Sequence, residues 1–287
     1  MKNEKDSLGD RMKRYEAATT EQYFMPELPL YARLDGRAFH TFTRGLGKPY
    51  PGAKNMDFTF FNLMALLCQA LVKDTNADLG YVQSDEISLG WKDVKSAPFD
   101  CRKFKMESVF ASLAGARFMQ LINKEQETVD SSRPFAEIRR RAEIHIPCFD
   151  CRVIQLPNLV ELANAFVWRE NDAIKNSISS YAMELFSDKE LHGKTQKERL
   201  EMLREKGMPW ESLLTCIRRG HYFAKVNYEV EGPNGEKAIR SRVDHVLVNH
   251  DQLAKIENKV GYLFDGEEPI LLDRSLGESG DSRKVKA

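Results

Sequence analysis

The order of the apolar segments between residues 30 and 156 restricts the fold of this chain more than any other feature of its sequence. Two short apolar segments flank a Ser-Asp-Glu turn, which is the pattern of a tight two-stranded hairpin. On each side of this hairpin lies a segment with the helical spacing of apolar residues. One further strand is expected before the first helix, and another after the second helix. The expected elements are a strand at 30–36, a helix at about 55–73, strands at 80–84 and 87–91, a helix at about 105–122 and a strand at 152–156.

This order of elements predicts a split βαββαβ unit. We therefore expect an α+β fold in which an antiparallel sheet carries its helices on one face. A short polar helix is expected at 6–17, the Gly- and Pro-rich residues 37–53 predict a loop, and the charged residues 123–143 predict an irregular connection. Many unrelated proteins share the βαββαβ pattern, so the pattern does not assign a function.

The C-terminal part predicts a helical and β-hairpin extension. It contains a long helix, a charged amphipathic helix, and two strands joined by an EGPNGE turn. These are expected at 159–186, 194–207, 222–230 and 238–246. The Gly, Ser and charged residues at the end predict a disordered tail. We accordingly divide the chain into residues 1–157, 158–274 and 275–287.

The composition assigns no function, but it argues against several classes of protein. Lys and Arg together number 43, as do Asp and Glu, so the formal net charge is zero. That balance gives no overall attraction to nucleic acid, and any RNA-binding surface must be local. The polar N-terminus predicts no secretory signal, and the lack of a long apolar run predicts no membrane span. Five scattered cysteines favour reduced thiols and a cytoplasmic protein.

Carboxylates stand at two places where this topology brings strand ends together. Asp35 ends the first strand, and Asp85 and Glu86 occupy the apex of the hairpin. In a split βαββαβ sheet the first strand lies beside the middle hairpin, so these positions meet. Two oxygen ligands there suit Mg²⁺, which takes water and phosphate oxygens for its other positions. Asp-Gly and Ser-Asp-Glu are also ordinary turn sequences, and the residues alone leave both interpretations open.

Five segments carry a resemblance to a known family: RLDGRAFHTFTRGLGKPY (33–50), YVQSDEISL (81–89), KMESVFAS (105–112), FDCRV (149–153) and WRENDAIKNSISSYA (168–182). Their order and spacing resemble those of the tRNA-His guanylyltransferase family and its guanylyltransferase-like 3′→5′ polymerase branch. The resemblance implies a polymerase-palm-like catalytic domain at 1–157, with the tRNA and nucleotide site completed by the C-terminal part. It also implies a nucleotidyltransferase that extends the 5′ end of tRNA. ATP or GTP would activate the 5′-phosphate, which the 3′-hydroxyl of GTP would then attack.

The resemblance further implies the site residues. Asp35 and Asp85 would bind two Mg²⁺ ions with the carbonyl of Gly36, where the missing Cβ permits close approach. Glu86 would join the two aspartates at the catalytic centre. Lys48 would reach a triphosphate as a mobile charge, and Lys105 would act at the start of a predicted helix, where anions are favoured. The residues that would bind ATP or GTP are Asp35, Gly36, Arg37, Ala38, Phe39, His40, Lys48, Ser84, Asp85 and Lys105.

One motif departs from the family. The eukaryotic enzymes carry His-Ile-Asn-Asn, associated with tRNA recognition, where this chain has IKNS (174–177). Asp172 and Asn176 are retained and are expected to bind RNA. Arg240 and Arg242 are expected to do so from one face of the predicted hairpin. The departure resembles a bacterial and archaeal branch whose members can repair 5′-truncated tRNAs by template. Guanosine addition to tRNA-His and general 5′-end repair therefore both remain open.

Further possibilities remain. His145, Cys148 and Cys151 have the spacing of three zinc ligands, with Cys101 as a possible fourth. Cys151 also falls within the FDCRV strand, where a cysteine is commonly a small buried side chain. A nucleotide cyclase and a non-catalytic tRNA-binding protein are the competing functions. The family resemblance also suggests a homotetramer.

Overall fold

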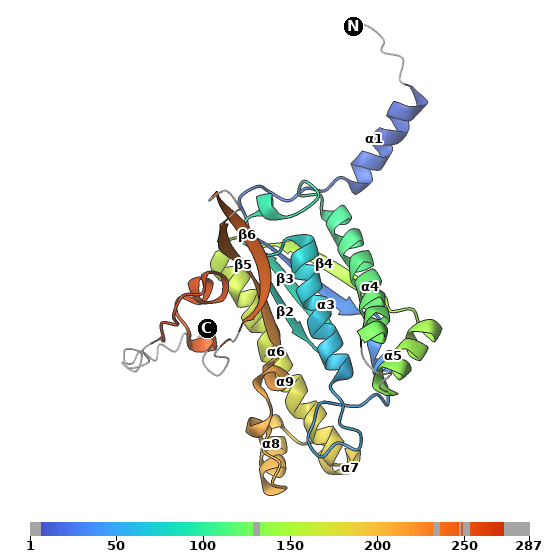
Figure 1. The fold of residues 1–287 in the computed structure, drawn as a ribbon, viewed down its shortest axis with the longest axis vertical. Coiled ribbons are helices and arrows are strands. Elements are labelled where there is room, and N and C mark those ends of the chain that lie inside the picture. Colours follow the sequence, from blue (N-terminus) through green and yellow to red (C-terminus); the bar gives the residue numbers. More distant parts are fainter. Residues whose placement is uncertain (1–6, 129–132, 232–235, 247, 249–252, 273–287) are drawn as a thin grey trace, which may run out of the picture.

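A computed structural model of the chain describes residues 7–128, 133–231, 236–246, 248 and 253–272. Its centre is a six-stranded sheet with helices packed against it (Figure 1). The strands are β1 (Leu30–Gly36), β2 (Leu79–Gln83), β3 (Glu86–Trp91), β4 (Phe149–Gln155), β5 (His221–Glu231) and β6 (Lys237–Val246). The helices are α1 (Leu8–Thr20), α2 (Phe39–Thr43), α3 (Thr59–Thr75), α4 (Lys103–Thr128), α5 (Arg133–Ile144), α6 (Leu159–Leu185), α7 (Asp188–Leu191), α8 (Gln196–Glu205) and α9 (Thr215–Arg219). Short helical turns lie at Val94–Ser96, Trp210–Ser212, Leu253–Lys255 and Gly261–Asp265.

The sheet confirms the predicted βαββαβ order. Its strands follow the order β4-β1-β3-β2-β5-β6, and each neighbouring pair is antiparallel. The predicted C-terminal hairpin is β5 and β6, and it continues the same sheet because β5 pairs with β2. β1 lies between β3 and β4, so Asp35 stands opposite both Glu86 and Asp150.

The side chains of β1 alternate between two cores, as its sequence predicts. Leu30, Ala32 and Leu34 are fully buried in the core that also contains the apolar faces of α3 and α4. Tyr31 faces the other way and packs edge-on against Phe166 of α6, with ring centroids 5.5 Å apart. α3 and α4 therefore cover one face of the sheet, as predicted for the βαββαβ unit, while α6 of the C-terminal part covers the other (Figure 1).

The connection between α4 and β4 is largely helical, so the prediction of an irregular segment at 123–143 is wrong. Ile138 and Ala142, one turn apart on α5, are 1% and 3% exposed. Charged residues occupy the remaining faces, and Arg141 pairs with Glu137 at 2.7 Å. The high charge density concealed an amphipathic helix whose apolar stripe is narrow.

The predicted loop at 37–53 begins with α2, whose position is fixed from two sides. Phe42 is buried in the core beneath α2. Arg141 of α5 donates hydrogen bonds to the carbonyls of Phe42 and Arg44 over 2.6 and 2.7 Å. Because carbonyls at a helix end lack partners within the helix, a guanidinium there satisfies them. α5 thus helps to hold the segment that follows Asp35.

A third core joins the C-terminal half of α6 to α8 and α9. Tyr181 and Trp210 are buried in it, and the Trp210 indole donates to the Ser177 hydroxyl over 3.1 Å. The Tyr81 hydroxyl of β2 donates to the Arg219 carbonyl over 2.7 Å. These contacts place α9 beside the end of β2, next to the hairpin that carries Asp85.

The N-terminal helix α1 differs from this packed body. α1 has no buried residue and projects away from the sheet (Figure 1). Ser7 caps it by accepting a hydrogen bond from the Asp10 backbone N–H over 3.1 Å. The predicted tail at 275–287 lies outside the described residues. Within the described part of the chain, no helix is both long and apolar enough to cross a membrane.

Candidate active site

Asp35 and the β2–β3 turn lie side by side at one end of the sheet. The Gly36 N–H donates to the Asp85 carbonyl over 3.2 Å, and Asp35 stands opposite Glu86 in the β1–β3 register. The turn is tight because Ser84 takes a left-handed backbone conformation with φ 53°. The predicted meeting of the strand end and the hairpin apex is therefore confirmed.

The carboxylates of Asp35 and Asp85 are partly withdrawn from water and repel each other. Burial raises the pKa of Asp35, and the charge of Asp150 raises it further, while Arg33 opposes the rise. Burial also raises the pKa of Asp85, and the charge of Asp35 adds to it. A hydrogen bond from its own backbone and the charge of Lys48 act in the opposite direction. A bound cation would offset both the desolvation and the repulsion.

The donor set fits a hard divalent cation that shares its coordination with a substrate. Among the described residues, no three His, Cys, Asp or Glu side chains converge into a complete metal site. Asp35 and Asp85 alone leave most positions of an octahedral ion open. Mg²⁺ commonly fills such positions with water and phosphate oxygens. The two aspartates therefore fit Mg²⁺ that is bound together with a phosphate group.

Glu86 is held by arginine side chains. Its carboxylate accepts two hydrogen bonds from Arg169 over 2.5 and 2.7 Å, and Arg33 lies 3.9 Å away. The side chains of Arg169 and Glu86 are 11% and 15% exposed, so water screens this pair only weakly. Burial raises the pKa of Glu86, against which Arg169 acts through its hydrogen bonds and its charge. Glu86 thus ties the hairpin to α6 directly beside Asp35.

Packing against Phe39 explains the glycine that follows Asp35. A Cβ on Gly36 would lie 2.5 Å from two atoms of the Phe39 ring. Phe39 is 2% exposed and packs against Phe42 and Phe149, with ring centroids 5.1 and 5.0 Å away. The aromatic cluster therefore requires a residue without a side chain at position 36. It stays a prediction that Gly36 also allows a metal or a phosphate to approach.

The segment after Gly36 turns sharply and exposes backbone N–H groups. Ala38 has a left-handed conformation with φ 59°, and the Arg37 N–H donates to the Cys148 carbonyl over 2.9 Å. The Arg37 and His40 side chains are exposed. For the N–H groups of Ala38, Phe39 and His40, the described residues supply no backbone acceptor. These donors are available to an anion such as a phosphate.

The backbone of Lys48 is held in place within the predicted loop. Its N–H donates to the Asn55 carbonyl and its carbonyl accepts from the Asp57 N–H, both over 3.0 Å. A Cβ on Gly47 would collide with the Asp57 side chain. Asp57 in turn accepts hydrogen bonds from the N–H and hydroxyl of Thr59 over 2.9 and 2.7 Å. Only the Lys48 side chain is left to adjust to a ligand.

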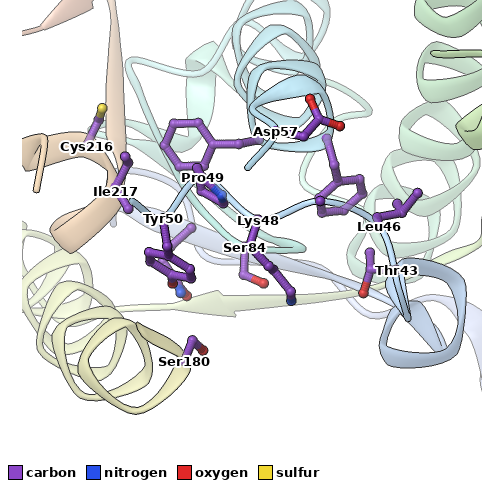
Figure 2. A pocket seen from close by; sticks show the side chains of 14 residues that line it. Thr43, Leu46, Lys48, Pro49, Tyr50, Asp57, Ser84, Ser180, Cys216 and Ile217 are labelled. Carbon is purple, nitrogen blue, oxygen red and sulfur yellow. The ribbon is translucent and has the colours of Figure 1, made fainter. Parts of the chain in front are cut away.

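A pocket opens beside Lys48 and Ser84, and the sequence did not predict most of its lining. Figure 2 shows side chains from the 43–50 loop, α3, the β2–β3 turn, α6 and α9 around it. One wall is Tyr50, whose ring stacks on Tyr181 at 5.3 Å between centroids. No local motif marks these residues, because five separate segments contribute them. The lining residues are Thr43, Leu46, Gly47, Lys48, Pro49, Tyr50, Asp57, Phe60, Phe61, Gln83, Ser84, Ser180, Cys216 and Ile217.

The predicted RNA-binding residues of α6 connect to the same site. Asp172 accepts hydrogen bonds from Arg169 over 3.1 Å and from the Asn176 amide over 3.3 Å. Since Arg169 also binds Glu86, a continuous polar chain runs from Asn176 to the β3 residue opposite Asp35. The structure thus brings Asp172 and Asn176 close to the two aspartates.

Three other predicted residues lie elsewhere. Lys105 lies in the first turn of α4, before Phe110, which stacks on Trp91 at 5.4 Å between ring centroids. Trp91 ends β3 at the end of the sheet opposite to the hairpin apex, so the structure corrects the expected place of Lys105. Arg240 and Arg242 pair with the part of β5 that extends past β2, again away from the apex. Their expected RNA contacts would lie on a separate surface.

The possible zinc ligands do not form a metal-binding group within the described residues. Cys151 lies on β4 and packs against the core between the sheet and α4, where burial raises the pKa of its thiol. Cys148 is exposed, and Cys101 lies just before the start of α4, whereas His145 follows the end of α5. The interpretation of Cys151 as a strand residue accounts for its position.

Comparisons with known proteins identify the family of this chain. A sequence model of the tRNA(His) guanylyltransferase family matches residues 9–157, more than half of the chain. The chain is 24% identical to the tRNA(His) guanylyltransferase of Debaryomyces hansenii over 270 residues, which covers 88% of this chain and 95% of the relative.

Two solved structures add to this. A bacterial tRNA(His) guanylyltransferase-like protein in complex with ATP is 31% identical, with a TM-score of 0.65 over 85% of this chain and 92% of its own. Such a protein in complex with GTP is 29% identical, with a TM-score of 0.60 over 86% of this chain and 92% of its own. The chain belongs to the tRNA(His) guanylyltransferase family.

Proposed function

We propose that this protein is a Mg²⁺-dependent nucleotidyltransferase that adds nucleotides to the 5′ end of tRNA in the 3′→5′ direction. The observation that carries the proposal is the junction of Asp35 with the hairpin apex at Asp85, beside a pocket and a lysine. Family membership and the names of the curated relatives support the substrate, and the nucleotide complexes of the bacterial structures support the use of ATP and GTP.

Asp35 and Asp85 would hold Mg²⁺, with the Gly36 carbonyl as a further oxygen ligand. Bound there, the metal would supply charge that activates an attacking oxygen and stabilises the departing phosphate. The chain's own residues prepare this site before any ligand arrives. The β2–β3 turn presents Asp85 to Asp35, and the Glu86–Arg169 pair fixes the turn to α6. Preorganised charges of this kind avoid reorganisation during the reaction.

The nucleotide would lie across the pocket and the start of α2. Lys48 can place a charge on the triphosphate, and the N–H groups of Ala38, Phe39 and His40 can donate to phosphate oxygens. Ser84 stands at the mouth of the pocket, where its hydroxyl can add a further hydrogen bond. The base and ribose would then occupy the pocket in Figure 2.

The reaction proceeds in two transfers. The 5′-phosphate of the tRNA attacks the α-phosphorus of ATP or GTP, and pyrophosphate leaves. The 3′-hydroxyl of GTP, or of a templated nucleoside triphosphate, then attacks the activated 5′-phosphorus and releases the nucleoside monophosphate, losing its proton. Each transfer exchanges one bond at phosphorus for another, so positioning and charge stabilisation supply most of the catalysis.

A second candidate within this class is template-dependent repair of 5′-truncated tRNAs. The motif IKNS (174–177) favours it, since the histidine of the eukaryotic motif is absent. A homotetramer is a further proposal that rests on the family resemblance, and light scattering of the purified protein tests it.

The decisive experiment incubates labelled tRNAs carrying a 5′-monophosphate with ATP, GTP and Mg²⁺. The proposal predicts that the labelled end is activated and then lengthened. If no tRNA were activated or extended, the proposal would be refuted. A cyclic nucleotide formed without RNA would favour a cyclase. Comparing tRNA-His with truncated tRNAs of other identities distinguishes the two substrate ranges, because equal or faster extension of the truncated set indicates repair.

A further inference from the structure

Trp168 is the exposed member of the three tryptophans in this chain. Trp91 and Trp210 are 0% and 6% exposed, whereas Trp168 on α6 is 53% exposed. A single exposed apolar side chain needs no explanation by itself. This ring, however, stands on the face of the sheet that carries Asp35, and two cations flank it.

Both cations are guanidinium groups held in place. The guanidinium carbons of Arg169 and Arg33 lie 4.7 and 5.6 Å from the centroid of the Trp168 ring. Arg169 cannot turn away without losing its two hydrogen bonds to Glu86, and Arg33 lies 3.9 Å from the same carboxylate. One partly buried carboxylate therefore holds Arg169 and lies within ion-pair distance of Arg33, and both cations stand against an exposed aromatic ring.

The ring lies close to the aspartates and beside an open part of the sheet. Arg33 precedes Asp35 by two residues on the same face of β1, which is about 7 Å along a strand. Arg152 of the edge strand β4 lies in register with Arg33, and its side chain is 62% exposed. An incoming RNA end can thus reach Asp35 past Arg33, Arg152 and one exposed aromatic ring, with Asp150 as an acidic neighbour 3.8 Å from Arg152.

This combination suits an unpaired nucleobase with its neighbouring phosphates. Aromatic rings stack on the π-face of any base, and arginine adds charge to both the base and the backbone. Sequence-independent binding of single-stranded nucleic acid uses such contacts. The proposed nucleotide pocket is lined by other residues, and Trp168 is not among them (Figure 2). Trp168 is therefore free for the second substrate.

We propose that Trp168, with Arg33 and Arg169, is a stacking platform for an unpaired nucleobase at the acceptor end of the RNA. The proposal rests on the proposed function in that it names how the RNA end is held beside Asp35. Stacking on an aromatic ring does not distinguish one base from another, so the platform can bind tRNAs of any acceptor sequence. The structure assigns Glu86 a positioning role here, because it hydrogen-bonds Arg169 and attracts Arg33.

Tryptophan fluorescence tests the stacking directly. The protein is titrated with a tRNA that has an unpaired 3′ end, in Mg²⁺ but without nucleoside triphosphate, so that no reaction occurs. We expect the emission to be quenched in the wild type, whereas Trp168→Phe, which retains only the two buried tryptophans, should show little change. A blunt-ended RNA duplex of similar length should leave the wild-type emission unquenched. An identical response of wild type and Trp168→Phe would overturn the proposal.

Affinity provides the second measurement. Trp168→Ala should weaken binding of the same tRNA by about five-fold to about 150-fold, the range for loss of one stacked base, and Trp168→Phe should retain most of the affinity. Tyr15→Ala is the matched control, since Tyr15 is 61% exposed on the projecting helix α1. Unchanged tRNA affinity in Trp168→Ala, or an equal loss in Tyr15→Ala, would contradict the assignment.

Separate assays distinguish this proposal from the proposed function. ATP affinity and the thermal midpoint of Trp168→Ala should equal those of the wild type, because the ring lies outside the nucleotide pocket and the core. A wild-type protein that quenches on RNA but never activates or extends it would refute the nucleotidyltransferase alone. A wild-type protein that extends tRNA without any effect of Trp168→Ala on RNA affinity would refute the platform alone.

Discussion

Replacing Gly36 by alanine perturbs the packing that holds Asp35 in position. The added carbon would stand 2.5 Å from two Phe39 ring atoms, about 1 Å inside the usual separation of ~3.5–4.0 Å between carbons. The ring is confined by Phe118 and Phe149, whose centroids lie 5.7 and 5.0 Å away, so it cannot move without disturbing the core. Gly36 does not adopt a left-handed conformation, so the backbone itself accepts alanine. We expect a loss of about 1–3 kcal/mol in the free energy of unfolding, the usual effect of overpacking.

Urea denaturation without metal or nucleotide measures this loss, and a double-mutant cycle identifies its cause. Phe39→Ala costs about 3–5 kcal/mol through the cavity that it leaves, but it removes the clash. Gly36→Ala should therefore cost little in the Phe39→Ala background, giving a coupling energy of about 1–3 kcal/mol. Gly9→Ala is the control, because its Cβ would meet nothing closer than the Ser7 hydroxyl at 3.8 Å. An equal cost of Gly36→Ala in both backgrounds would refute the steric explanation.

Three further perturbations test other parts of the structure. Lys48→Ala should weaken ATP binding about ten-fold or more in calorimetry, since a hydrogen bond to a charged group contributes about 1.5–3 kcal/mol; unchanged affinity would remove Lys48 from the triphosphate site. Arg219→Met should destabilise the fold by about 3–5 kcal/mol in urea, because it takes the cation from Glu170, whose side chain is 3% exposed; a loss below about 1 kcal/mol would contradict a buried pair. Burial raises the pKa of Tyr50 from 10.0 to about 12, so the folded state keeps this proton to a higher pH than the unfolded chain does. Its contribution is full below pH 10 and falls between pH 10 and about pH 12, by up to about 2–3 kcal/mol. Tyr50→Phe should lessen that alkaline decline, and an identical pH dependence would contradict the assignment.

The parts of the fold that depend on local patterns could be predicted from the sequence. The alternation of Tyr31 and Arg33 with Ala32 and Leu34 correctly predicted the two faces of β1. The Ser-Asp-Glu turn correctly predicted a hairpin, and topology alone brought Asp35 to it. These predictions succeeded because period-two alternation and tight turns are properties of a few consecutive residues.

Other features depended on contacts that no local pattern records. α5 looked irregular because only a narrow stripe, including Ile138 and Ala142, is buried beneath its charges. The family motif gave no position for Lys105 in space, and α4 carries it to the far end of the sheet. The proposed nucleotide pocket combines five separate segments, so residues such as Ser180 had no signal before the fold was known.

The central claim is that Asp35 and Asp85 form the metal-dependent centre of 5′-nucleotide addition to tRNA. Single-turnover extension of a labelled, 5′-truncated tRNA with ATP, GTP and Mg²⁺ tests it most directly, with wild type, Asp35→Ala and Asp85→Ala compared at equal tRNA occupancy. We predict that the wild type extends the RNA, that both variants bind the tRNA but neither activate nor extend it, and that EDTA stops the wild type. Extension at the wild-type rate by either variant, or by the wild type in EDTA, would contradict the claim.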